Sequence, residues 1–229
     1  MVTLELRQIS VPPGQRLVLN YVNWEEFEAI LQELGDRRPT RLAYYQQTLE
    51  IRMPLPEHEA SKELIGDMVK ILLEELEMDR ECFGSTTFKR EDMAAGIEPD
   101  NCFYIQNHQL MIGKTRLDLS IDPPPDLAIE VDLTSKTQLD IYAALGVPEL
   151  WRYEKGRLKI SLWQNGKYID SAISATFPQL PVIAGICQFL DLSKTAGMSP
   201  ALRGFRKWIR EQGTVKSLRS NSKFKIKDN

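Results

Sequence analysis

The sequence predicts an α/β fold with a mixed central β-sheet flanked by helices, and three observations support this prediction. Residues 23–35 and 57–77 repeat apolar side chains with the 3.6-residue period of an amphipathic helix. Several short stretches alternate apolar and polar side chains or are rich in β-branched and aromatic residues, as strands are. Helices and strands interleave without a regular βαβ repeat, which indicates a mixed sheet.

The first part of the chain contains the two strongest helix signals. Asn23 is a good N-cap residue, Glu26 stands where the partner of a capping box belongs, and Gly35 suits the C-terminal stop. Residues 41–53 follow and predict two short strands joined by a turn. The longer helix is expected over residues 57–77, with apolar side chains along one face.

The middle of the chain predicts strands. They are expected at residues 84–89, 102–105, 118–121 and 126–133. In the last of these stretches the apolar side chains face one way, while Glu130 and Asp132 face the other. Two carboxylates therefore share one face of a predicted strand.

The last part of the chain predicts one more helix, three strands and two terminal segments. Thr134 or Ser135 is expected to cap the helix, and Gly146 to end it. A hairpin turn is expected at Gly156. The strands are expected at residues 150–153, 158–163 and 167–169, an apolar piece at 186–190 and a short basic helix at 202–210.

Composition and charge indicate how the chain is divided into a domain and a tail. The chain has 229 residues, of which 42% are hydrophobic, so it can bury a sizeable core. We expect residues 1–195 to form a single domain and residues 196–229 a basic C-terminal helix and tail. From Arg203 onward nine basic side chains oppose Glu211 and Asp228, a net charge of +7, which leaves −10 for the rest because the whole chain carries −3. This segment either attracts a polyanion through counterion release or is a solvated terminus.

Cysteine and histidine are too few for several kinds of site. The three Cys form no C-x-x-C pair, so a disulfide framework and a cysteine zinc site are not expected. With two His, a histidine-rich metal site is excluded as well. No apolar run reaches the roughly 18 residues of a membrane span, and the N-terminus lacks the pattern of a signal peptide. We therefore expect a soluble, cytoplasmic protein with no membrane partner.

The candidate chemistry lies in carboxylates. Asp100 follows Pro99 at the start of one predicted strand, and Glu130 lies inside another. On adjacent strands the two carboxylates can point to the same face, where they repel each other unless a cation lies between them. Mg²⁺ and Mn²⁺ suit such oxygen ligands, and Asp132 could add a third oxygen. Lys136 could reach back over the strand end to orient water or offset phosphate charge.

Simpler explanations remain open for these residues. A carboxylate on an alternating strand usually faces solvent, and a Pro-Asp pair is ordinary turn chemistry. Tyr142 is expected in core packing, and His58 at a helix start rather than as a base. No Ser-His-Asp pattern and no Gly-rich phosphate loop is present, which argues against a serine hydrolase and against nucleotide-driven chemistry.

Three motifs, in the expected order, carry a resemblance to a known family. They are residues 96–105 (GIEPDNCFYI), 124–135 (PPDLAIEVDLTS) and 141–153 (IYAALGVPELWRY). The chain resembles the Uma-type putative restriction endonuclease family, part of the PD-(D/E)XK nuclease superfamily, over most of residues 20–195. The resemblance implies a restriction-endonuclease-like fold, a divalent metal (Mg²⁺ or Mn²⁺) and hydrolysis of phosphodiester bonds in DNA.

The resemblance also implies roles for individual residues. Asp100 matches the aspartate of the family's Pro-Asp pair, and Glu130 matches the acid of its third motif. The superfamily usually has Lys two residues after that acid, where this chain has Asp132. The family is known for a lysine displaced toward the following helix, and Lys136 is the nearest candidate.

A further acid is expected on the long helix. Glu59 matches the superfamily's early-helix acid best, and Glu63, one turn later, is its rival. Gln138 lies where a supporting polar residue is often found. The resemblance thus implies Asp100 and Glu130 as metal ligands, with Glu59 orienting or supporting the metal.

Two competing hypotheses remain. A catalytically silent DNA-binding or interaction module could keep the same fold. Asp132 and the net charge of −10 on the chain before Arg203 favour it, since a negative surface repels duplex DNA. The fold could also serve self-association through a sheet-edge strand such as residues 158–163, and we expect a homodimer.

Overall fold

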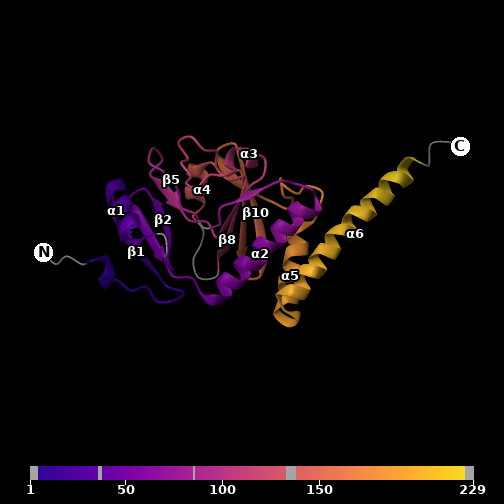
Figure 1. Ribbon diagram of the computed structural model, residues 1–229, viewed down its shortest axis with the longest axis horizontal. Coiled ribbons are helices and arrows are strands. Elements are labelled where there is room, and N and C mark those ends of the chain that lie inside the picture. The colour runs from indigo at the N-terminus through magenta and orange to yellow at the C-terminus, as the bar shows by residue number, and fades with distance from the viewer. Residues whose placement is uncertain (1–4, 36–37, 85, 133–137, 225–229) are drawn as a thin grey trace.

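The computed structural model describes residues 5–35, 38–84, 86–132 and 138–224, with side chains described as far as residue 212. The molecule is a mixed α/β fold in which two sheets are flanked by helices (Figure 1). This confirms the fold class predicted from the sequence. The strands, however, divide between two sheets instead of forming one central sheet.

The first sheet has five strands, and its described pairs are all antiparallel. In spatial order the strands are β1 (Arg16–Asn20), β3 (Thr48–Arg52), β2 (Arg41–Tyr45), β6 (Ala95–Ile97) and β5 (Phe88–Arg90). The predicted hairpin over residues 41–53 is confirmed as β2 and β3. Gln46 and Gln47 at its turn have φ values of 44° and 66°, as a two-residue type I′ turn requires.

The second sheet has six strands and mixes their directions. Strands β8 and β9 are parallel, and the other described pairs are antiparallel. In spatial order the strands are β11 (Lys167–Ser171), β10 (Arg157–Gln164), β9 (Glu149–Glu154), β8 (Leu127–Asp132), β7 (Asn101–Tyr104) and β4 (Glu81–Cys82).

The chain passes from the first sheet to the second over Glu98, Pro99 and Asp100, between β6 and β7. Pro99 has no N–H to donate to a sheet ladder, so strand pairing ends readily at this position. The connection therefore separates the two sheets and places Asp100 at their junction.

Helix α1 (Trp24–Leu34) covers one face of the first sheet (Figure 1). The predicted capping box is confirmed, because the amide N of Glu26 donates to Asn23 Oδ1 at 2.8 Å and the amide N of Asn23 donates to Glu26 Oε2 at 2.8 Å. Phe27 stacks on Tyr44 of β2 with ring centroids 4.5 Å apart. This contact centres a small core, whose other buried members are Val22, Leu42, Leu49 and Ile51.

The largest core lies between the second sheet and two helices, α2 (Pro56–Glu75) and α5 (Val182–Ala196). The helix predicted over residues 57–77 is thus confirmed. Its buried face includes Leu64, Ile65, Met68 and Leu72. From β8 this core takes Leu127, Ile129 and Val131, so Glu130 and Asp132 point to the opposite face.

Helix α4 (Leu139–Leu145) connects the parallel strands β8 and β9, as a crossover between parallel strands must. Gly146 ends it in the left-handed conformation at φ 78°, as predicted. The predicted caps Thr134 and Ser135 lie outside the described residues, and Gln138 stands at the N-cap position. The remaining short helices are η1 (Leu6–Gln8) and α3 (His108–Met111).

Three predictions about strands were wrong. Residues 118–121 form turns, because the Asp118 carboxylate accepts hydrogen bonds from its neighbour Ser120, which favours a local turn over a sheet ladder. Residues 84–89 are not one strand, since β4 ends before them and β5 begins at Phe88. Residues 158–163 are not at a sheet edge, because β10 lies between β9 and β11.

Helix α6 (Met198–Phe224) is far longer than the short helix predicted at residues 202–210. Its first half packs on α2 and α5, and its far end extends away from the rest of the molecule (Figure 1). Ala201, Phe205 and Ile209 are buried in this contact. No helix in the described parts of the chain is both long and apolar enough to cross a membrane.

Candidate active site

Asp100 and Glu130 come together where the two sheets meet. In the antiparallel pairing of β7 and β8, Asn101 is opposite Ile129. When this register is continued by one residue, Asp100 is opposite Glu130. The amide N of Val131 donates to Asp100 Oδ2 at 2.8 Å, which fixes the aspartate against β8. Both residues are nearly inaccessible to solvent, since Asp100 is 2% exposed and Glu130 is 1% exposed. The pair is therefore buried, as carboxylates rarely are without compensation.

The environment separates the two acids. Burial and the nearby charge of Asp100 raise the pKa of Glu130 well above its ordinary value. Burial would also raise the pKa of Asp100, but the hydrogen bond and charge of His58, with the amide of Val131 and the charge of Arg52, lower it instead. The two acids therefore differ in proton affinity, and Glu130 holds a proton more tightly than Asp100 does.

Two basic side chains from different elements stabilise the ionised form of the buried acids. His58 on α2 places Nε2 3.0 Å from Asp100 Oδ2, and this contact raises the pKa of the imidazole although burial opposes it. Arg52, at the end of β3, comes from the first sheet. Burial disfavours its charge, but the charges of Glu130 and Asp100 overcome this and raise the pKa of the guanidinium.

Glu59 is linked to the pair through His58. Its carboxylate lies 3.2 Å from His58 Nδ1 and 3.2 Å from Lys62 Nζ. Helix geometry explains the second contact, since residues three apart share a face. Glu63 is more exposed, and its carboxylate comes no closer than 4.0 Å to Lys62 Nζ. Glu59, and not Glu63, is therefore the acid that is linked to Asp100 through His58.

Tyr142 forms a hydrogen bond with Glu130. The tyrosine, on α4, donates its hydroxyl hydrogen to Glu130 Oε1. Burial and the charge of Glu130 raise the pKa of this hydroxyl far above its ordinary value, so it remains a donor. Tyr142 is packed in the core as predicted, and it also contacts the site.

The other residues considered from the sequence are placed as follows. Asp132 is buried, and its charge contributes to the raised pKa of Glu130. Lys136 lies outside the described residues. Gln138 is exposed at the start of α4 and makes no side-chain cap.

Sequence reasoning missed Arg52 and Lys62 and underrated His58. Arg52 comes from the other sheet, so no local spacing relates it to Asp100. A weak signal existed for His58 and Lys62, because residues 58, 59 and 62 are charged or polar at helical spacing before the apolar stripe of α2 begins.

Two other buried carboxylates, Glu149 and Asp126, have different partners from this pair. Glu149 accepts hydrogen bonds from Trp151 Nε1, Ser174 Oγ and the amide and hydroxyl of Thr176, at 2.6 to 2.8 Å. Asp126 accepts from the amides of residues 105–107. Neutral donors satisfy these two acids, so they stabilise the local structure. In contrast, Asp100 and Glu130 depend on each other's neighbours and on cations.

The donor set fits a hard divalent cation. Within the described residues no group of three or more His, Cys, Asp and Glu side chains is arranged to hold a metal ion. Mg²⁺, however, usually keeps several water ligands and is bound by one or two carboxylates together with substrate phosphates. Asp100 and Glu130 are two carboxylates of the kind that such a cation requires.

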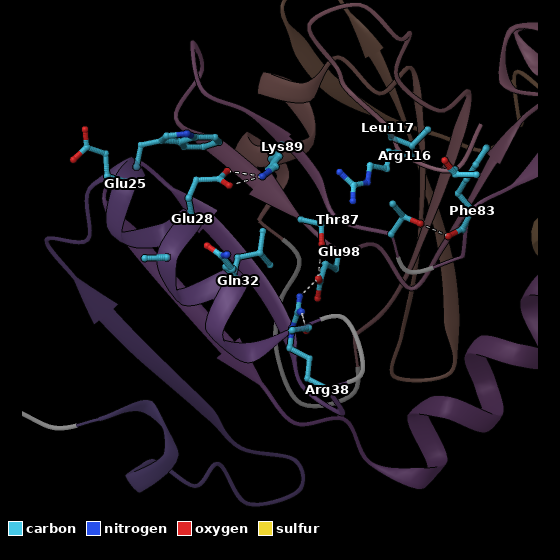
Figure 2. A pocket seen from close by; sticks show the side chains of 16 residues that line it. Glu25, Glu28, Gln32, Arg38, Phe83, Thr87, Lys89, Glu98, Arg116 and Leu117 are labelled. Atoms are coloured by element: carbon cyan, nitrogen blue, oxygen red, sulfur yellow. Dashed lines mark hydrogen bonds and ion pairs between the residues drawn. The ribbon is translucent and has the colours of Figure 1, made fainter. Parts of the chain in front are cut away.

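A broad cleft of about 1210 Å³ lies near the same junction, between α1 and the loops around Thr87 and Arg116 (Figure 2). Glu98, two residues before Asp100, lies at its wall and accepts hydrogen bonds from Arg38, from Thr87 Oγ1 at 2.7 Å and from the amide of Leu42 at 3.0 Å. These contacts anchor the connection that leads into Asp100.

A family model and one solved structure relate the chain to known proteins. Residues 24–192 match the model of the Uma2 family, described as putative restriction endonucleases. Among solved structures, the chain is similar to a putative nuclease of the DUF820 group from Anabaena variabilis ATCC 29413. The sequence identity is 14%, the TM-score is 0.44, and the match covers 67% of this chain and 87% of that chain. No curated protein matches the chain.

Proposed function

Because this chain belongs to the Uma2 family of putative restriction endonucleases, we propose that it is a metal-dependent endonuclease that hydrolyses phosphodiester bonds in DNA. The observation that carries the proposal is the buried pair of Asp100 and Glu130 at the junction of the two sheets. Two buried carboxylates with opposed pKa shifts are typical of catalytic or metal-binding sites.

Asp100 and Glu130 would hold Mg²⁺ or Mn²⁺. A divalent cation at such a site lowers the pKa of a bound water and offsets the charge that develops on a phosphate. Asp100 is prepared for this role because His58 and the amide of Val131 keep it ionised and fixed. Glu130 is oriented by the hydroxyl of Tyr142.

The first turn of α2 supports Asp100 from outside. Glu59 contacts one nitrogen of His58, and the other nitrogen faces Asp100. This chain of contacts orients the imidazole, as carboxylates commonly orient histidines in catalytic sites. Glu59 therefore acts on Asp100 through His58 in this proposal. Lys136 keeps the role predicted from the sequence, which is to orient water or to offset phosphate charge.

A second candidate function follows from Arg52. Its guanidinium already supplies positive charge to both carboxylates, and Asp132 stands where the superfamily has a lysine. Both features favour a catalytically silent module that binds DNA or another partner on the same fold. In that case the carboxylates and Arg52 form a stabilising ion network.

A cleavage assay separates the two functions. Wild type, Asp100→Ala and Glu130→Ala are incubated with supercoiled, linear and single-stranded DNA, with Mg²⁺, with Mn²⁺ and with EDTA. The nuclease proposal expects cleavage by wild type that EDTA and either substitution abolish. Equal cleavage by all three proteins would reject the site, and no cleavage by wild type in any condition would favour the silent module.

DNA is the partner that the nuclease proposal expects, and a homodimer remains a prediction. With residues 158–163 inside the second sheet, the described strands at its edges are β11 and β4. Light scattering that shows a monomer at working concentrations would contradict the dimer.

A further inference from the structure

Three arginines form a row across the first sheet. Arg16 on β1 and Arg41 on β2 are both paired in register with Arg52 on β3. Residues paired in this way point to the same face of a sheet. We call Arg16, Arg52 and Arg41 the arginine row.

The arginine row faces the carboxylate pair. Leu42, next to Arg41, points to the opposite face and belongs to the core under α1. Ala43, two residues after Arg41 and therefore on its face, is buried with Ala128 and Tyr142. The face that carries the row is thus the one that packs against β8 and α4, between the two sheets shown in Figure 1.

The row also ends beside Asp100. Ala43 of β2 pairs with Ile97 of β6, and the amide N of Glu98 donates to the carbonyl of Leu42 at 3.2 Å. Continued by one residue, this register sets Arg41 opposite Pro99. Arg41 therefore lies next to the connection that carries Asp100.

Acidic partners account for only part of this positive charge. Glu50 lies 2.9 Å from Arg16 Nη1 and 3.5 Å from Arg52 Nε. The side chain of Arg41 has no hydrogen bond or ion pair among the described residues, and its Nε is buried without an acceptor. The buried hydroxyl of Thr40, the preceding residue, has no partner there either.

This arrangement costs stability. Like charges directly opposite each other on neighbouring strands are destabilising. A buried donor that lacks an acceptor also lowers the stability of the folded protein. Sites that bind an anion regularly carry such costs in the free protein, because the ligand later supplies the missing acceptor.

We propose that the arginine row binds a backbone phosphate of DNA beside the carboxylate pair, with Arg41 as its principal contact. The proposal rests on the proposed function for the identity of the substrate. Guanidinium groups suit this ligand, since their planar fork donates two hydrogen bonds to one phosphate. Arg52 lies between Arg41 and Arg16, so a phosphate at the row would also offset the repulsion within it.

The test measures binding to a short fluorescein-labelled DNA duplex by anisotropy, in Ca²⁺ and across a series of salt concentrations. The main variant is Arg41→Gln, and Arg41→Lys keeps the charge without the fork. Lys167→Gln is the matched control, because Lys167 is exposed at the start of β11 and the β10–β11 turn lies at the opposite end of the second sheet from Asp132.

The expected result for Arg41→Gln is binding weakened about tenfold, as for the loss of one charged hydrogen-bonding group. The slope of log affinity against log salt should become shallower by about one. Arg41→Lys should retain the slope and lose part of the affinity. The melting temperature of Arg41→Gln should stay the same or rise, since a like-charge contact is removed. Lys167→Gln should match wild type.

If Arg41→Gln binds DNA with the same affinity and salt slope as Lys167→Gln, the inference is overturned. The proposed nuclease function is not affected by this result if cleavage still depends on Glu130. Wild type that does not bind DNA at all overturns both proposals. Binding that depends on Arg41 without any cleavage supports the arginine row and rejects the nuclease. If Arg41→Gln fails to fold, Arg16→Gln replaces it, because the Arg16 side chain is 53% exposed, and the same shallower slope is expected.

Discussion

Asp100 and Glu130 face each other across two neighbouring antiparallel strands, and the aspartate is tied to the glutamate's strand by a 2.8 Å hydrogen bond from the amide of Val131. This relationship depends on Pro99, which ends the first sheet and lets the chain enter the second with Asp100 at the junction. The buried carboxylates are compensated by His58 and Arg52, which come from a helix and from the other sheet.

Tyr142→Phe tests the support of Glu130. The substitution removes the hydroxyl that donates to Glu130 and leaves the ring packed. Loss of a donor to a buried acid should lower the free energy of unfolding by about 1–3 kcal/mol, measured by urea titration. Tyr168→Phe is the control, because its hydroxyl donates to the neutral carbonyl of Val147 at 2.6 Å, so a smaller loss is expected. Equal losses would contradict a special role for Tyr142.

Gly66→Ala tests the packing of α2 against the start of β7. A Cβ at Gly66 would lie 2.6 Å from Nδ2 of Asn101, the residue after Asp100. Alanine favours a helix by about 1 kcal/mol over glycine. We expect the steric conflict to outweigh this and to destabilise the protein by about 1–3 kcal/mol.

The double variant Gly66→Ala/Asn101→Ala is the control for that prediction. It removes the conflicting side chain, so most of the stability lost in Gly66→Ala should return relative to Asn101→Ala alone. Additive losses in chemical denaturation would show that the two residues do not interact.

Glu75→Gln tests how α6 is held. Glu75 Oε2 lies 2.7 Å from Arg210 Nε, and Glu75 Oε1 lies 2.7 Å from Arg206 Nη1. The hydrogen bonds from Arg210 and Arg206 lower the pKa of Glu75 from 4.5 to about 2. A lowered folded-state pKa means that the stabilisation is fully present above pH 4.5 and is lost as the pH falls toward 2.

Melting temperatures measured across this pH range check the prediction. The melting temperature of wild type should exceed that of Glu75→Gln at neutral pH. As the pH falls toward 2, the two melting temperatures should converge. A constant gap would mean that the ion pairs do not stabilise the helix.

Deletion of the residues after Gly213 tests the basic tail. It removes Lys216, Arg219, Lys223, Lys225 and Lys227 and keeps Arg206 and Arg210, which pair with α2. If the tail contacts DNA, the truncated protein should bind a labelled duplex more weakly and with a shallower salt dependence. An unchanged slope would identify the tail as a solvated terminus.

The sequence predicted helices and strands well where their ends depend on residues close by in the chain. Asn23, Glu26 and Gly35 delimit α1 as expected, because caps act within one turn. Alternation in β8 correctly placed Glu130 opposite to the apolar face. In contrast, residues 118–121 were mistaken for a strand, since the turn formed by Asp118 and Ser120 overrides a short apolar pattern.

The site could be predicted only in part, for a physical reason. Asp100 and Glu130 lie on strands that are close in sequence, and motif resemblance selected them. Arg52 reaches them from the first sheet, and that division depends on where Pro99 interrupts pairing. Contacts between sheets depend on tertiary packing, which no spacing within one element encodes.

The most direct test of the central claim is a crystal structure of the protein soaked in Mn²⁺, with anomalous diffraction used to locate the metal. The account predicts an anomalous peak within bonding distance of both Asp100 and Glu130 in wild type, and its loss in Glu130→Gln. A map with no peak at these carboxylates, while Arg52 remains beside them, would contradict a metal-dependent nuclease site.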